Sequence, residues 1–167
     1  MPNDNAVKTA KVSDRRKLSF TTMAEILGDI EMLDAAVKDG KTISATGNWT
    51  PAQIIEHVLF FIDGSMDGFD FKAPLILRIF GKFARSQILN NPMKPGFKLP
   101  ATMRMVIPNP KSTWPDAVSH ALKAILRVEA GKYMSKPSPL LGKMAHQDWV
   151  KLHCRHAEMH LSFIRVE

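Results

Sequence analysis

The sequence predicts an all-α protein, an up-down-up-down bundle of four helices with a long proline-rich crossover between the second and third core helices. Two observations lead to this fold class. Apolar residues recur at three- and four-residue spacing in four segments, and the alternating pattern typical of strands is almost absent. The 167 residues fit one domain. We expect residues 1–17 to form a flexible N-terminal arm and residues 18–167 to form the helical domain.

The first two core helices have recognisable ends. The first is expected from about Thr21 to Val37, and Gly40 follows it as a left-handed cap. The second starts at a capping box, in which Thr50 is a good N-cap and Gln53 lies three residues later. A proline between them suits the first helical position. These signals place the start of the second helix directly after Thr50.

The rest of the chain continues the helical pattern after an interruption. A short helix is expected over residues 74–89, and residues 90–112 carry five prolines and form an extended crossover. A structureless loop of that length is unusual in a compact domain, so we expect contacts to order it. The third core helix is expected over about residues 114–130 and the last over about residues 146–166.

The net charge of +7 is local. Residues 71–111 contain no acidic residue and hold eight basic ones: Lys72, Arg78, Lys82, Arg85, Lys94, Lys98, Arg104 and Lys111. We expect the apolar arc of the 74–89 helix to pack on the bundle, or on the partner subunit of a homodimer, with its cations solvated. Contact with an anionic membrane surface is the less favoured alternative. Nucleic-acid binding is not expected, because exposed aromatics and a groove-reading helix are missing from the pattern.

Cysteine use and hydropathy point to a cytoplasmic protein. The lone cysteine, Cys154, excludes an intramolecular disulfide and fits a reducing cytosol. On the helical wheel it lies toward the polar side, so we expect a semi-exposed thiol. No run approaches the ~20 apolar residues of a membrane span, and the polar, charged start is unlike a secretory signal.

The last helix carries three of the six histidines within eight residues: His153, His156 and His160. At about 100° per residue all three project into the apolar stripe, where an unpartnered polar group costs roughly 1–3 kcal/mol. His156 and His160 are four residues apart, the spacing that lets two imidazoles bind one metal ion. The third ligand could be His153 by spacing, or His57 on the second helix by topology. By contrast, His120 lies among charged residues and is expected at the surface.

Two segments carry a family resemblance. They are residues 48–57 (NWTPAQIIEH) and residues 141–161, with LGKM followed by Trp149, His153, His156 and His160. On these segments the sequence resembles the DinB-like (YfiT-like) superfamily of metal-dependent four-helix-bundle proteins. The family's metal triad is one histidine on the second helix and a pair on the last, which the resemblance maps onto His57, His156 and His160. His153 then becomes a neighbour that could line the pocket.

The resemblance implies a divalent-metal-dependent enzyme, with Zn²⁺, Ni²⁺, Mn²⁺ or Fe²⁺ as the ion. The better-understood members are transferases or isomerases that use a thiol cofactor, so a low-molecular-weight thiol and a transferase, isomerase or hydrolase reaction are expected. The reacting group would be a water or thiol on the ion. The basic segment could receive the carboxylates of the thiol cofactor, and the substrate is expected to be a small molecule, with an anion as one option.

A general base is not identifiable from the sequence. Glu56 points about 100° away from His57 on the helical wheel, and Glu158 is expected to face solvent. The alternative function is a non-catalytic binding module. In that reading residues 71–111 form the interaction surface, and the histidines are structural groups held by backbone carbonyls and water.

Overall fold

The computed structural model describes residues 6–96 and 105–167, and these residues form five α-helices and one small sheet. The elements follow a 3₁₀ turn at Thr9–Lys11. In chain order they are α1 (Met23–Lys38), β1 (Ile43–Ala45), α2 (Pro51–Asp67), α3 (Leu75–Asn90), α4 (Trp114–Glu129), α5 (His146–Leu161) and β2 (Ile164–Val166). The mostly helical structure confirms the predicted all-α class in its broad form.

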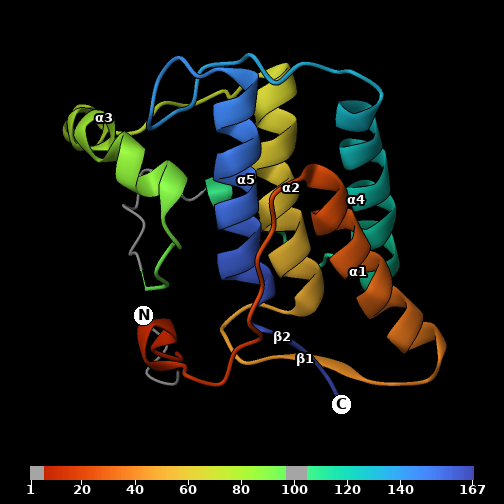
Figure 1. Cartoon of the computed structure of the whole chain (residues 1–167). Helices are drawn as coiled ribbons and strands as arrows, with labels where there is room; N and C mark the ends of the chain where they lie inside the picture. Colours follow the sequence, from red (N-terminus) through yellow and green to blue (C-terminus); the bar gives the residue numbers. More distant parts are fainter. Residues whose placement is uncertain (1–5, 97–104) are drawn as a thin grey trace.

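Four of the helices share one hydrophobic core. α2 packs against α4 and α5, and α1 packs against the same two helices, so each of the four has two neighbours. Figure 1 shows these four side by side, with α3 standing at one flank. Large residues without solvent contact fill the space between them, among them Ile26, Ile30, Leu33, Ile55, Leu59, Ile62, Ile125 and Leu161. α2 therefore faces both α4 and α5 across this core.

The start of α2 predicted from its capping residues is confirmed, and two further helices begin at threonine caps that were not predicted. Thr50 and Gln53 form a complete capping box at the start of α2, and Thr22 forms a second one at the start of α1. Thr113 accepts a hydrogen bond from a backbone N–H of the first turn of α4. After α1 the chain reverses at Gly40, whose φ of 84° is the left-handed conformation expected of this cap.

The last helix is shorter than predicted. It ends at Leu161, and Ile164–Val166 instead pairs with Ile43–Ala45 as an antiparallel ladder, in which Ile43 faces Val166. Phe163 and Ile164, which follow α5, are still buried. The apolar residues therefore keep helical spacing beyond Leu161, although the helix has ended. Periodicity cannot separate these two cases over so few residues.

α3 is attached to the core by a narrow inner face. Its fully enclosed residues are Gly81 and Leu89. A Cβ on Gly81 would lie 3.0 Å from the carbonyl oxygen of Leu140, which explains the close approach of the helix to that loop. Arg85 adds an ion pair to Asp148 on α5, at 2.7 Å. The apolar arc was expected to pack on the bundle or on a partner subunit. Packing on the bundle is wrong for its outer side, and packing on a partner subunit stays a prediction. Five large side chains are exposed there: Leu75, Ile76, Ile79, Phe80 and Phe83.

Parts of two predicted segments lie outside the described residues, namely residues 1–5 of the N-terminal arm and residues 97–104 of the crossover. From residue 6 onward the arm contacts the domain. The Val7 backbone exchanges two hydrogen bonds with the Asn48 side chain, and the Arg16 guanidinium pairs with Asp29 at 2.8 Å. Within the described ranges, no helix has both the length and the apolar character required to cross a membrane.

The prediction of a semi-exposed cysteine is wrong. Cys154 is buried, with its Sγ near the backbone carbonyl of Thr22 at the start of α1. Burial raises the pKa of this thiol to about 11. The helical wheel placed Cys154 toward the polar side of α5, but the start of α1 covers that side. A protonated, enclosed thiol is a packing residue.

Candidate metal site

α2 and α5 bring three histidines together from positions almost a hundred residues apart in the chain. One nitrogen each of His57, His156 and His160 lie within 4.8 Å of one another. The ring centroids are 4.5 Å apart for His57 and His160, 5.1 Å for His57 and His156, and 4.6 Å for His156 and His160. Nitrogens that share one ion at about 2.0–2.1 Å stand roughly 3–3.5 Å apart. Small ring rotations would therefore close the site around an ion.

Local sequence explains why the three rings meet. The capping box at Thr50 fixes the start of α2, and His57 follows two helical turns later on the side that packs against α5. His156 and His160 are one turn apart on α5, so their side chains lie one above the other along one face of that helix. Thus α2 supplies one ligand and α5 supplies the other two.

A backbone carbonyl orients His57. Its Nδ1 lies 2.8 Å from the carbonyl oxygen of Val106, in the segment that precedes α4. A carbonyl can only accept, so Nδ1 carries the proton and Nε2 keeps a free lone pair. Metal-binding histidines are usually held in this way, with the second nitrogen donating to a carbonyl or carboxylate. Sequence reasoning did not find Val106, because a backbone acceptor has no side-chain signature.

Aromatic rings form the walls around the three imidazoles. Trp49, from the turn before α2, lies 4.7 Å from the His57 ring and stacks on His160 at 5.7 Å between centroids. Phe61, one turn after His57, makes edge contacts with His57 and His156 at 5.3 and 5.0 Å. A hydrophobic shell of this kind limits water access and lowers the local dielectric constant.

This enclosure keeps the imidazoles neutral. Burial lowers the pKa of His57 to about 4, although its hydrogen bond to Val106 works in the opposite direction. Burial, followed by the charge of neighbouring histidines, also places the pKa of His156 and of His160 well below 6.5. Neutral imidazole is the form that donates a lone pair to a metal ion. At pH 7 all three rings are therefore ready to bind one.

His153 has a different environment from the triad. It is fully buried, its ring stacks on Trp149, and its Nε2 lies 3.1 Å from the Ser65 hydroxyl. The Ser65 hydroxyl donates to the Ile62 carbonyl, so it accepts from Nε2 of His153. Burial lowers the pKa of His153 to about 3, and its Nδ1 has no hydrogen-bond partner among the described residues. It is a core histidine, and its spacing to His156 alone would have suggested a ligand.

Carboxylates near the triad are engaged elsewhere. Glu56 turns away from His57, as expected, and meets His120 on α4. The prediction that Glu158 faces solvent is wrong, because it is buried, accepts a hydrogen bond from the Phe20 backbone N–H and pairs with Arg155 at 2.8 Å. The chain segment before α1 covers this face of α5. Each carboxylate thus has a structural partner.

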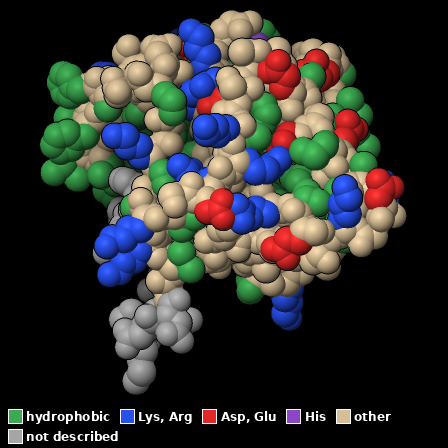
Figure 2. Space-filling view, turned by 60° about the horizontal axis from the view of Figure 1, so that its bottom comes forward, with side chains coloured by type: hydrophobic (Ala, Val, Ile, Leu, Met, Phe, Trp, Pro, Cys, Tyr) green, Lys and Arg blue, Asp and Glu red, His purple; other side chains and the backbone are tan. Residues whose placement is uncertain are grey.

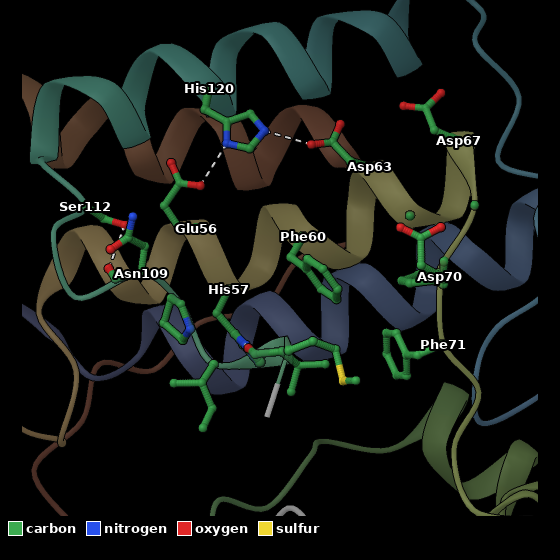
Figure 3. Close-up of a pocket in the computed structure, with 17 residues that line it drawn as sticks. Glu56, His57, Phe60, Asp63, Asp67, Asp70, Phe71, Asn109, Ser112 and His120 are labelled. Atoms are coloured by element: carbon green, nitrogen blue, oxygen red, sulfur yellow. Dashed lines mark hydrogen bonds and ion pairs between the residues drawn. The ribbon is translucent and has the colours of Figure 1, made fainter. Parts of the chain in front are cut away.

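His120 is not the simple surface residue that was predicted. Its Nδ1 lies 2.9 Å from Glu56 and its Nε2 lies 2.7 Å from Asp63, both on α2 (Figure 3). The hydrogen bond with Asp63 is the largest of the causes that raise its pKa to about 9. Arg127 on α4 extends the network to Asp63 and Asp67. Two acids on α2 and two bases on α4, each pair seven residues apart, form the sequence signal that could have revealed it.

A cavity of about 530 Å³ lies beside this network. Its lining includes Glu56, Asp63 and His120 on one side, and Phe60 and His57 on another (Figure 3). Residues 105–109 and 68–71 complete the wall. His156 and His160 do not line it, whereas His57 and Val106 do.

Comparison with known proteins finds a family match. A family model described as Protein of unknown function (DUF1569) matches residues 12–167. No curated protein and no solved structure matches the chain.

Proposed function

The chain belongs to the family described as Protein of unknown function (DUF1569), and we propose that it is a divalent-metal-dependent enzyme whose ion is held by His57, His156 and His160. One observation carries the proposal. The three imidazoles converge within 4.8 Å, and among the described residues the rings of His156 and His160 have no hydrogen-bond partner. The third ring, His57, is hydrogen-bonded through Nδ1 to the Val106 carbonyl, which leaves its Nε2 lone pair free for an ion.

The donor set fits a catalytic type of site. Three neutral nitrogens fill only three coordination positions of Zn²⁺, Ni²⁺, Mn²⁺ or Fe²⁺, which leaves at least one position for a reactant. Such an ion would supply Lewis-acid chemistry and lower the pKa of a water or a thiol. Val106 holds His57 in the correct tautomer, and Trp49 and Phe61 pack against the rings.

The class of reaction follows from the resemblance to the DinB-like superfamily. A low-molecular-weight thiol as cofactor, in a transferase, isomerase or hydrolase reaction on a small and anionic substrate, is the form we propose. The engagement of Glu56 and Glu158 with structural partners supports a mechanism without a carboxylate base at the triad.

The same resemblance suggests the finer description of the fold. We infer a four-helix bundle of the DinB-like type, formed by α1, α2, α4 and α5, and the pairings of α2 and of α1 with α4 and α5 support it. The predicted up-down-up-down order is wrong for α2 and α4. Glu56, early in α2, meets His120, early in α4, and Asp67, at the end of α2, meets Arg127, late in α4, so these two helices run parallel. In such a bundle α2 and α5 lie next to each other and can share a ligand site.

Metal analysis of protein purified without an affinity tag or chelator tests the proposal. We expect about one ion per chain. The ion should be lost in His57→Ala and in His156→Ala, because two imidazoles cannot hold it tightly. His120→Gln and His153→Gln are the matched controls, and both should keep the ion. Wild-type protein that is metal-free and binds none of the four ions on titration would refute the metal site.

Cobalt substitution tests the thiol separately. Co²⁺ in the triad gives a visible spectrum, and a thiol that reaches an open position adds a sulfur-to-cobalt charge-transfer band. We expect this band when a low-molecular-weight thiol is added to the wild-type protein, and no such band with the matching alcohol. A cobalt spectrum that ignores the thiol would leave the metal site in place and exclude the thiol cofactor.

A further inference from the structure

α3 exposes an apolar face that the rest of the described chain does not cover. The exposed fractions are 67% for Leu75, 63% for Ile76, 49% for Ile79, 65% for Phe80 and 86% for Phe83. At about 180–200 Å² per side chain, they leave roughly 600 Å² of apolar surface in water. The largest apolar patch of an ordinary monomer is about 300–600 Å² and is often functional. These five residues, the α3 apolar face, therefore need an explanation.

The orientation of α3 is fixed by its inner side. Gly81 lies against the backbone of Leu140, and Arg85 bonds both to the Lys143 carbonyl and to Asp148. Because these contacts hold the opposite side of the helix, the α3 apolar face must point outward. Figure 2 shows hydrophobic side chains gathered at the flank where α3 lies, with Lys and Arg side chains next to them.

The charges around this face are of one sign. Lys72, Arg78 and Lys82 are exposed. At about 100° per residue, Arg78 and Lys82 follow one edge of the apolar arc. Residues 71–96 contain no acidic side chain, and the nearby Asp148 is already paired with Arg85. The face therefore combines a convex apolar surface with unneutralised cations along its edge.

We propose that α3 docks the protein on an anionic membrane surface, with the α3 apolar face in the boundary between headgroups and acyl chains. Helices that lie in this boundary present large apolar side chains on one side and Lys or Arg next to them. A second copy of α3 would offer the same cations and no countercharge. An anionic lipid surface offers both the apolar layer and the negative charge. Binding would be peripheral and independent of the metal site.

Flotation with lipid vesicles tests this proposal on the full chain. We expect binding to vesicles of equal parts phosphatidylcholine and phosphatidylglycerol, little binding to phosphatidylcholine alone, and weakening as salt is raised from about 0.1 M to about 0.5 M. Phe80→Ser/Phe83→Ser and Arg78→Glu/Lys82→Glu should each lower the bound fraction about tenfold or more. All four side chains are exposed, so the variants should unfold at the wild-type temperature.

The matched control is Leu122→Ser/Leu126→Ser, which removes two exposed apolar side chains from α4, with fractions of 42% and 49%. It should bind like the wild type. Equal binding of wild type and both α3 variants would overturn the proposal. So would a dimer, measured by light scattering, that Phe80→Ser/Phe83→Ser dissociates while no form binds the vesicles. In that case the face would be a contact between two copies.

Discussion

Replacing His120 with glutamine should remove a contribution to stability that depends on pH. In the folded protein the His120 ring lies between Glu56 and Asp63, at 2.9 and 2.7 Å, and its pKa is raised from 6.5 to about 9. A group whose pKa is higher in the folded state stabilises it while protonated. Its contribution is fully present below pH 6.5 and is lost as the pH rises through 9.

The size of the effect follows from the same geometry. The change in pKa corresponds to an upper limit of about 3 kcal/mol, at about 1.4 kcal/mol per pH unit. Because 36% of the His120 side chain is exposed, screening by solvent reduces this to about 1–2 kcal/mol. At about pH 6 the His120→Gln variant should be less stable than wild type by that amount, or about 3–6 °C in Tm. Near pH 9.5 the difference should be close to zero.

Urea unfolding at several pH values, with a chelator present so that metal binding adds no pH dependence, measures the difference. Lys123→Gln is the matched control. It removes an exposed positive charge from the same helix and should give the same difference at every pH from 6 to 9. A difference in unfolding free energy between wild type and His120→Gln that stays constant from pH 6 to 9, or grows with pH, would refute the reasoning.

Three further predictions concern packing and burial. Gly64→Ala should lower the free energy of unfolding by about 1–3 kcal/mol, because a Cβ there would overlap the ring of Phe69. Gly28→Ala has open space around it and should raise the free energy of unfolding by about 0.5–1 kcal/mol. Thermal unfolding of both variants measures the two changes. Thr50→Ala removes the N-cap of α2 and should cost about 1 kcal/mol in urea unfolding, so an unchanged midpoint would contradict the cap. Metal-free protein should lose stability as the pH falls below 6.5. The pKa of His153 in the folded protein is about 3, so between these values only the unfolded chain protonates this ring, and the loss from this residue should be roughly 2 kcal/mol at about pH 5. In His153→Leu the free energy of unfolding should depend less on pH.

Local sequence signals predicted where the helices begin, but they did not predict where α5 ends. The capping box at Thr50 and the left-handed Gly40 depend only on neighbours in the chain, so both were readable from the sequence. The end of α5 was not, because the strand that replaces its last turn exists only through pairing with Ile43–Ala45. A ladder between chain segments this far apart leaves no periodic trace in three residues.

The candidate site shows the same division. Spacing alone showed that His156 and His160 share one face of a helix, and resemblance supplied His57 as the third histidine. The structure brings the three together. Only the tertiary structure showed that Val106 orients His57 and that His153 is occupied by Ser65. Both depend on which backbone or hydroxyl groups come near once the helices pack.

By itself, the sequence determined the helices, their starts and the histidine pair on α5, since these depend on contacts within a few residues. Tertiary structure decided which side chains are enclosed. Cys154 and Glu158 lie toward the polar side of α5 and yet are buried, because the start of α1 and the residues before it cover them. The α3 apolar face lies on an equally apolar arc and yet is exposed. A helical pattern specifies a direction around one helix, and only the packing of the others determines what lies in that direction.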